Sequence, residues 1–325
     1  MPLSAILDAM SALRTLAVTV SLLTLAACVG DDAPATATAT DAGVAADSTT
    51  PDSGTGSEDA GIDTGAVDAE PPPAPAPPVV SPYVWLDARR FPAETVSTTR
   101  WPDATANNAN AVGETALSID RTALNGRPGV VFVGETKQVL SIPAKDIPAL
   151  RMAGMSQGFS VFMVAGIKSN APARTAQAVL FERAGTDGGF VTPKRYGVQL
   201  SLNRELTNVE GWTKGYAATG PQVEAVVTGK APTPTAAHLY VLTASNGELA
   251  LRVDGVQVDK KIGFVENSFV ENGNLPLNLG AYSSTSSAQF GFVGAMGMFA
   301  LYTRPLAVAD IVAGEAATKA AWGIP

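Results

Sequence analysis

The sequence predicts an all-β fold for residues 81–325, an antiparallel β-sandwich of the jelly-roll kind, and three observations indicate it. Short runs rich in Val, Phe and Leu are separated by Gly, Pro and Asn about every ten residues. In residues 198–202 and 249–253 apolar and polar side chains alternate with a period of two. Asp254-Gly255 stands between two such runs and is a strong signal of a two-residue hairpin turn. Strands that follow one another without intervening helices pair antiparallel, which predicts a sandwich or jelly roll.

The individual elements follow from the same pattern. Strands are expected at residues 83–86, 129–133, 139–142, 159–167, 178–183, 196–202, 223–227, 238–243, 249–253, 256–264, 275–281 and 289–302. One short helix is expected near the C-terminus, at about residues 308–321, because this segment is rich in alanine. Its apolar stripe is expected to consist of Ile311, Val312, Ala316 and Ala320.

The N-terminal segment has the pattern of a secretory signal. Residues 15–27 form an apolar run that is too short to span a membrane, which takes roughly 20 residues. The run ends in Leu-Ala-Ala-Cys, with the chain's only cysteine at Cys28. These four residues resemble the lipobox of bacterial lipoproteins, which implies cleavage before Cys28 and acylation of its thiol. The alternatives are an ordinary signal peptide with an incidental cysteine, and a translation start at Met10 instead of Met1.

Composition separates a tether from a folded domain. Residues 29–80 hold ten acidic residues and no Lys or Arg, and they consist mainly of small residues and proline. Such a segment buries too little apolar surface to fold, so a disordered linker is expected. Residues 81–325 hold 19 acidic and 21 basic residues, so the net charge of −8 comes from the linker. The expected organisation is a signal peptide at 1–27, a lipidated linker at 28–80 and a domain at 81–325. A nearly neutral domain argues against a nucleic-acid partner.

Several stretches of the domain match a known pattern in order. The first reads Val-Trp-Leu-Asp-Ala at residues 84–88, and a later one reads Leu-Asn-Gly-Arg-Pro-Gly-Val-Val-Phe at residues 124–132. The other stretches are 100–103, 107–111, 249–258, 275–280, 292–306 and 319–323. Together they resemble bacterial laminin G-like domains of the concanavalin A-like lectin and glucanase superfamily. The resemblance departs at Ala307, where the family has a Ser or Thr helix cap, a loss of about 1 kcal/mol.

The resemblance implies a fold more than a function. Members of the superfamily include glycan binders, adhesive modules, appended enzyme domains and glycanases. Most matched residues have structural roles: Asn125-Gly126 is expected to form a turn, and Asp87 and Asp103 are expected to bond local backbone. No cofactor is expected from the residues themselves, and only the family resemblance implies a calcium site. Its oxygen ligands would come from Asp187, Asn203, Asn208 or Glu210.

A search for catalytic residues favours a non-enzymatic protein. A glycanase needs two carboxylates on one face, and the Glu-x-Asp-x-x-Glu strand of the superfamily's glycanases is absent from the sequence. The remaining acid pairs are Asp254 with Asp259, Glu205 with Glu210, and Glu266 with Glu271, which are expected to be solvated. His238 is the only histidine, and no Gly-x-Ser-x-Gly elbow accompanies it. With one histidine and a lipidated cysteine, no zinc site is expected.

The best binding candidate is the segment 203–220, which is expected to be a loop. Its candidate ligand-binding residues are Asn208, Trp212, Lys214 and Tyr216, because sugars offer apolar faces that are rimmed by hydroxyl groups. The alternative is that Trp212 and Tyr216 fold back over a sheet edge.

These observations predict a surface-anchored lipoprotein of the bacterial cell envelope with a non-catalytic domain that binds a glycan or a surface protein. Val29 follows Cys28 in place of an aspartate, which favours the outer membrane. The alternatives are a glycan hydrolase or lyase with an unrecognised site, and a structural envelope lipoprotein.

Overall fold

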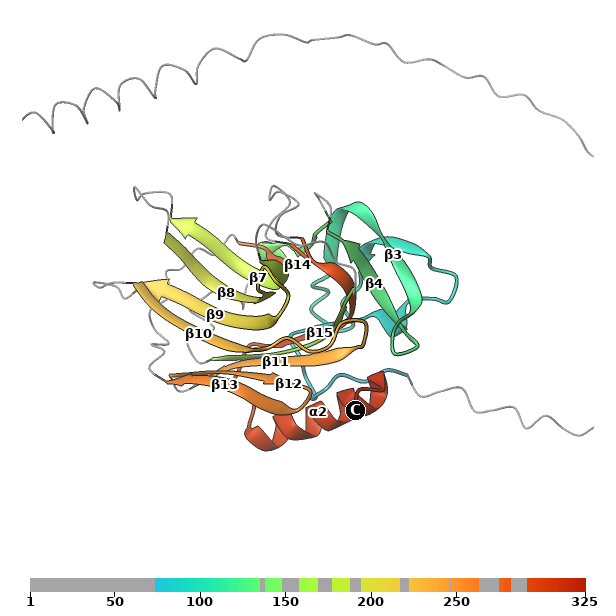
Figure 1. Ribbon diagram of the computed structural model, residues 1–325. Helices are drawn as coiled ribbons and strands as arrows, with labels where there is room; N and C mark the ends of the chain where they lie inside the picture. Colours follow the sequence, from blue (N-terminus) through green and yellow to red (C-terminus); the bar gives the residue numbers. More distant parts are fainter. Residues whose placement is uncertain are drawn as a thin grey trace, which may run out of the picture. The chain divides into compact units, whose positions relative to one another are not determined.

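The structure is a computed structural model that describes residues 74–134, 138–147, 158–168, 177–187, 194–216, 222–245, 247–262, 275–281 and 291–325. Cys28 and the expected signal and most of the expected linker lie outside these residues. The described part is an antiparallel β-structure with one α-helix, α2 (Val308–Trp322), and two short 3-10 helices, Ala88–Arg90 and Ala144–Asp146 (Figure 1). Among the described residues, no helix has both the length and the apolar character needed to cross a membrane.

Fifteen strands form a single sheet. They are β1 (Val84–Asp87), β2 (Ser97–Trp101), β3 (Ala111–Leu124), β4 (Arg127–Val133), β5 (Leu140–Ile142), β6 (Phe159–Ile167), β7 (Ala178–Asp187), β8 (Lys194–Leu202), β9 (Asn208–Tyr216), β10 (Gln222–Lys230), β11 (His238–Ser245), β12 (Glu248–Val253), β13 (Val256–Ile262), β14 (Leu277–Leu279) and β15 (Val293–Tyr302). Their order is β10-β9-β8-β7-β14-β5-β3-β4-β15-β6-β11-β12-β13, with β1 also paired to β15 and β2 to β3.

The two ends of this sheet, β10 and β13, meet. The backbone N–H of Thr228 in β10 donates to Asp259 Oδ2 in β13 at 2.8 Å. Gly229 in β10 lies so close to β13 that a Cβ on it would stand 2.5 Å from Val258 Cγ2. The sheet is therefore nearly closed, and the charged side chains of β13 cover an edge that would otherwise expose backbone groups.

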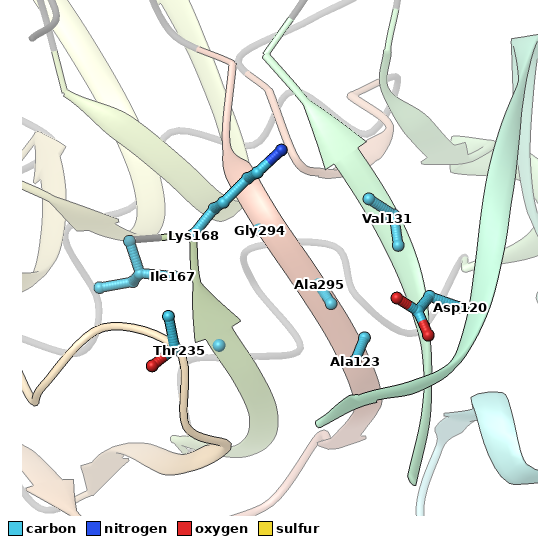
Figure 2. A pocket seen from close by; sticks show the side chains of 9 residues that line it. Asp120, Ala123, Val131, Ile167, Lys168, Thr235, Gly294 and Ala295 are labelled. Carbon is cyan, nitrogen blue, oxygen red and sulfur yellow. The ribbon is translucent and has the colours of Figure 1, made fainter. Parts of the chain in front are cut away.

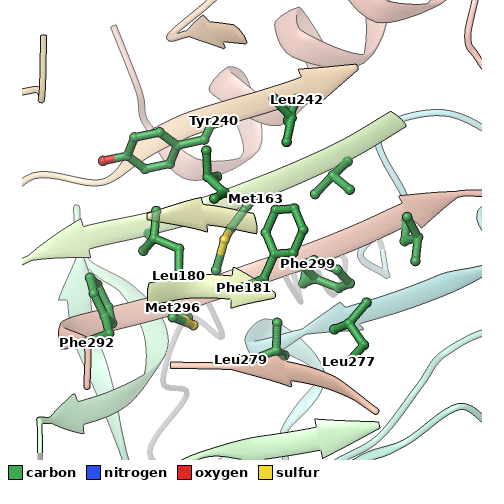
Figure 3. Close-up of a cluster of buried hydrophobic side chains, with 14 of the residues drawn as sticks. Met163, Leu180, Phe181, Tyr240, Leu242, Leu277, Leu279, Phe292, Met296 and Phe299 are labelled. Atoms are coloured by element: carbon green, nitrogen blue, oxygen red, sulfur yellow. The ribbon is translucent and has the colours of Figure 1, made fainter. Parts of the chain in front are cut away.

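The main hydrophobic core fills the space between the two layers of this curved sheet. On one side lie β7 to β10 and on the other β6, β11, β12 and β15 (Figure 1). Figure 3 shows Phe181 of β7 beside Phe299 of β15, and their ring centroids are 5.5 Å apart at an interplanar angle of 62°. Every residue of β6 and β15 is buried, because these strands have the core on one face and a second cluster on the other.

Helix α2 covers that second cluster. Its buried residues are Ile311, Gly314, Glu315, Thr318 and Trp322, so the expected stripe is correct only at Ile311. Val312, Ala316 and Ala320 are exposed. Glu315 can face inward because both of its oxygens accept hydrogen bonds from Arg252 of β12, Nε to Oε1 at 2.7 Å and Nη2 to Oε2 at 2.9 Å. As expected, no side chain caps the helix at Ala307.

The chain enters the domain beneath this helix. The Tyr302 hydroxyl accepts from the Val79 N–H at 2.9 Å and donates to the Val79 carbonyl at 2.7 Å. Burial raises the pKa of Tyr302 to about 12, so this hydroxyl keeps the proton that it donates. Gly314 makes room for the segment, since a Cβ there would lie 2.9 Å from Val79 Cγ2. Val79 is thus part of the packed structure, although the linker was expected to reach residue 80.

Most expected strands are present, and two local predictions are confirmed in detail. Asp254 (φ 51°) and Gly255 (φ 87°) join β12 to β13, and Asn125 (φ 52°) and Gly126 (φ 76°) join β3 to β4. Positive φ at both central residues is the geometry of a type I′ turn. Asp103 accepts four hydrogen bonds, from the N–H groups of Trp85, Thr105 and Ala109 and from the Thr105 hydroxyl. Strands β2, β3 and β9 were not expected.

Candidate functional site

Side chains on β9 alternate between the core and the outer face of the sheet. A Cβ on Gly211 would lie 2.5 Å from Leu242 Cδ1 of β11, so Gly211 faces the core. Val209 belongs to the core cluster and faces the same way, as does Thr213. Asn208, Glu210 and Trp212 therefore lie on the side of the sheet away from the main core. Trp212 belongs to neither hydrophobic cluster, and its exposed fraction is 4%.

The outward side chains of five strands form a row across the sheet. The register pairs Ser141 of β5 with Asn278 of β14, Asn278 with Glu182 of β7, Glu182 with Gln199 of β8, and Gln199 with Trp212 of β9. Three further polar residues adjoin this row. We call the whole set the polar face: Ser141, Gln177, Glu182, Gln199, Ser201, Glu210, Trp212 and Asn278.

Hydrogen bonds connect most members of the polar face. The Ser141 hydroxyl lies 2.7 Å from Asn278 Oδ1 and donates to it. Gln199 Nε2 donates to Gln177 Oε1 at 3.1 Å, and Gln177 Nε2 donates to Glu210 Oε2 at 3.0 Å. The side-chain amides of Gln177 and Gln199 thus link the Glu210 carboxylate of β9 to the middle of β8.

Two polar atoms on this face are buried and have no partner. Gln199 and Ser201 have exposed fractions of 0%, yet Gln199 Oε1 and the Ser201 Oγ accept and donate no hydrogen bond. Leaving such a group unpaired costs about 1–3 kcal/mol. Native proteins pair the large majority of buried polar groups, so each exception requires an explanation. The two atoms are on the same face of one strand, two residues apart, and Gln199 is directly beside Trp212.

The sequence-predicted binding residues lie on a strand and not in a loop, so that expectation is wrong. The turn that precedes β9 is tight: Asn203 Oδ1 accepts from the N–H groups of Thr207 and Asn208 at 2.8 and 2.9 Å. Trp212 lies between Gln199 and Val226 in the middle of three paired strands, so it does not fold over a sheet edge either.

The remaining two candidates share the strand but are less fully described. Lys214 and Tyr216 belong to β9, and the register places Lys214 between Gly197 and Glu224. Their side chains lie outside the described residues.

The described acids of the expected pairs, Asp254, Asp259, Glu205 and Glu210, each accept hydrogen bonds within the fold. Asp259 accepts from β10, and Glu205 Oε2 accepts from Asn203 Nδ2 at 3.2 Å. Glu266 and Glu271 lie outside the described residues. Sequence reasoning missed Glu182, which shares the polar face with Glu210. No sequence signal marked it, because residues 178–181 are uniformly apolar and the register shift between Val179 and Phe181 sets the face on which Glu182 lies.

Calcium ligands do not converge in the described residues. The Asn203 side-chain oxygen is occupied by its turn, and the Asp187 side chain lies outside the described residues. No group of three or more His, Cys, Asp or Glu side chains that could hold a metal occurs in the described part of the chain.

His238 is held between two acceptors. Its Nδ1 lies 2.7 Å from Asp254 Oδ2, and its Nε2 lies 3.0 Å from the Thr233 carbonyl oxygen. Burial alone lowers the pKa of His238, but the hydrogen bond and charge of Asp254, with the Thr233 carbonyl, outweigh it and raise the pKa above 6.5. When both ring nitrogens carry a proton, the ring donates to both acceptors, so the arrangement of His238 is structural.

No protein-family model matches the sequence, and no curated protein matches it. Solved structures with some likeness include a Trypanosoma rangeli sialidase in complex with sialic acid (14% identity, TM-score 0.46), with 73% of this chain and 33% of the sialidase covered. The binding domain of botulinum neurotoxin DC in complex with SialylT has 11% identity and a TM-score of 0.44, with 73% and 52% covered. The CBM40 of Ruminococcus gnavus IT-sialidase bound to α2,3-sialyllactose has 14% identity and a TM-score of 0.37, with 48% and 81% covered. The chain spans a third of the sialidase, and a likeness of this degree assigns it no function.

His238 makes the stability of the domain depend on pH. Because its pKa is raised in the folded state, its contribution is fully present below about pH 6.5 and is lost as the pH rises through the folded pKa. We expect the free energy of unfolding to fall as the pH rises above about 6.5, and the fall to be reduced in His238→Gln. Urea unfolding of both proteins over this range measures it. Since His238 is the only histidine, an equal fall in His238→Gln would contradict this assignment.

Proposed function

We propose that this chain is a lipid-anchored, non-catalytic glycan-binding protein whose ligand lies on the polar face. The observation that carries the proposal is the pair of buried, unpartnered atoms, Gln199 Oε1 and Ser201 Oγ, beside Trp212. A sugar supplies what both atoms lack, because each of its hydroxyl groups can donate and accept a hydrogen bond. Its apolar face suits the ring of Trp212, since aromatic side chains combine a large contact area with a specific geometry.

The charges of the polar face favour a neutral glycan. Among the side chains that the structure describes, the charged members of this face are two carboxylates, Glu182 and Glu210, and both already have a partner in the fold. Carboxylates accept hydrogen bonds from sugar hydroxyls, but they repel the carboxylate of an acidic sugar at close range. A neutral hexose therefore fits the polar face better than a sialic or uronic acid does.

We further propose that the sheet is a concanavalin A-like jelly roll of the laminin G-like kind. Support comes from the ordered sequence likeness in residues 82–325, from the nearly closed antiparallel sheet, and from the single helix that follows the last strand. In this arrangement the polar face is the side of β7, β8 and β9 that lies away from the main core, and the helix covers the other layer.

The anchor remains a proposal on the sequence alone. Cys28 ends an apolar run in Leu-Ala-Ala-Cys, and acylation of its thiol with two or more chains would hold the protein firmly at a membrane. The acidic, proline-rich segment that follows would keep the domain away from the lipid, and the bacterial cell envelope, at its outer membrane, is the proposed location.

A glycan hydrolase is the second candidate, because Glu182 and Glu210 share one face. They lie on strands two apart and are offset by two residues. Strand spacing and rise then put their Cα atoms about 12 Å apart. If the side chains lean toward each other, the carboxyl groups come within the roughly 6.5–9.5 Å of an inverting enzyme.

Ser201 tests the polar face directly, because its hydroxyl has no hydrogen-bond partner in the fold. Ser201→Ala removes a buried group without a partner, so stability should be unchanged or higher. Binding of the ligand should weaken at least about tenfold, because a hydrogen bond to the bound sugar is lost. A panel of neutral oligosaccharides, each with its sialylated counterpart, titrated into the full chain by calorimetry identifies the ligand and measures the change.

The matched control is Thr213→Val, which removes an equally buried, unpartnered hydroxyl from the core side of β9. It should leave binding within twofold. Trp212→Phe, which keeps a ring, should bind more weakly than wild type and more tightly than Trp212→Ala. A protein that binds no glycan of the panel, or a Ser201→Ala variant with unchanged affinity, would overturn the site and favour a protein ligand or a structural role.

The hydrolase alternative has its own test. With the neutral oligosaccharides of the panel as substrates, we expect no release of reducing ends above that of buffer. Release that disappears in both Glu182→Gln and Glu210→Gln would instead make the chain a hydrolase.

If Cys28 carries the lipid anchor, replacing it should change the cell fraction in which the protein is found. In a bacterial host, Cys28→Ala should abolish labelling by radioactive palmitate and move the protein from the membrane fraction to the soluble one. Val29→Ala, which keeps the thiol, should remain in the membrane fraction. Unchanged membrane association of Cys28→Ala would show that the cysteine is incidental.

A further inference from the structure

A second recess lies on the outer face of the other layer, away from the polar face. It is an open trough of about 250 Å³ beside the cluster that α2 covers. Its floor includes Val131 of β4, Gly166 of β6 and Ala295 of β15, so it is apolar and shallow. Figure 2 shows Asp120 on one wall and Lys168 and Thr235 on the other.

The charged side chains on the two walls, Lys168 and Asp120, can each form a further hydrogen bond or ion pair with a ligand. Lys168 is exposed, and no carboxylate pairs with its side chain in the described part of the chain. Its backbone N–H donates to the Val293 carbonyl at 3.1 Å, which fixes the residue at the rim. Asp120 uses Oδ1 to accept from the N–H and the hydroxyl of Thr122, at 2.8 and 2.9 Å. A carboxylate has two oxygens, so Asp120 retains acceptor capacity at the opposite wall.

Thr235, at the same rim, adopts a strained backbone. Its φ is 80°, and a β-branched residue with positive φ is a genuine outlier. The conformation is held by a hydrogen bond from the Thr235 N–H to the Ile167 carbonyl at 2.8 Å. Glycine would adopt this φ without strain. The Thr235 hydroxyl donates to the Pro234 carbonyl at 2.5 Å, and its oxygen retains the capacity to accept a hydrogen bond at the rim. Strained residues cluster at functional sites.

We propose that this trough binds a small hydroxylated carboxylic acid of the uronic-acid type. Lys168 receives the carboxylate, Asp120 and Thr235 bind ring hydroxyls, and the C–H face of the ring lies on the apolar floor. The volume lies below the roughly 300–1,000 Å³ of sites for drug-sized ligands, which limits the ligand to about one sugar ring. The trough and the polar face are thus complementary, one for an acidic sugar and one for a neutral glycan.

Titration of the full chain with glucuronate and with methyl glucoside tests the proposal by NMR shift changes. Glucuronate should bind at least about tenfold more tightly than the neutral sugar, and Lys168→Gln should abolish that difference. Lys145→Gln, the same change at an exposed lysine on another element, should not alter it. Thr235→Gly should raise the melting temperature and weaken glucuronate binding, which separates the strain from the function.

The proposal for the trough and the proposal for the polar face can be contradicted independently. Ser201→Ala should leave glucuronate binding unchanged, and Lys168→Gln should leave neutral-glycan binding unchanged. Absence of glucuronate binding to the wild-type chain, equal binding of the neutral sugar, or full binding by Lys168→Gln would overturn the proposal. Glucuronate binding that is lost in Ser201→Ala would also overturn it, by moving the ligand to the polar face.

Discussion

Strand β15 changes its hydrogen-bonded partner at Gly297, and the arrangement of the two layers depends on this point. Residues 293–296 pair with β4, residues 298–301 pair with β1, and β6 pairs along the other edge with a bulge at Gly297. The ring of Trp322 occupies the space that a side chain would take, since a Cβ on Gly297 would lie 2.4 Å from its Cη2. From β4 the sheet continues through β3, β5 and β14 to the polar face, and from β6 it continues to β11, β12 and β13. A close contact between helix and strand therefore sets where the sheet divides.

Local sequence patterns predicted the strands whose signal is local. All nine residues of 159–167 are buried. The sequence predicted this strand, because a continuous apolar run between turn residues is the pattern of a fully buried strand. Strand β9 was mistaken for a loop because two of its core-facing positions are Gly211 and Thr213, which do not read as apolar. Gly211 is required there by Leu242 of β11, a neighbour that lies 31 residues away in the sequence. Strand β3 was missed for a related reason, because most of its 14 residues are at least partly exposed.

Of the candidate site, the sequence predicted only residues that lie together in one segment of the chain. Trp212 was found from composition alone. Its neighbours Gln199 and Glu182 were not, because the row depends on the register between strands that only the folded sheet brings together. The helix shows the same limit: Glu315 faces inward because Arg252, 63 residues earlier, supplies a bidentate partner. Hydrophobic periodicity cannot detect a buried charge whose partner is on another element.

The buried polar groups that the structure describes differ in how the cost of their burial is offset. Asp103 accepts four hydrogen bonds, so its burial is compensated within the fold. The indole N–H of Trp322 has no partner, but a large ring offsets that cost through the apolar area that it buries. Ser201 has neither compensation, because its side chain is one small polar group. Thr213, on the core side of β9, is in the same condition, so an unpaired buried hydroxyl does not by itself indicate a ligand. What distinguishes Ser201 is its place two residues from Gln199, on the face that also holds Trp212.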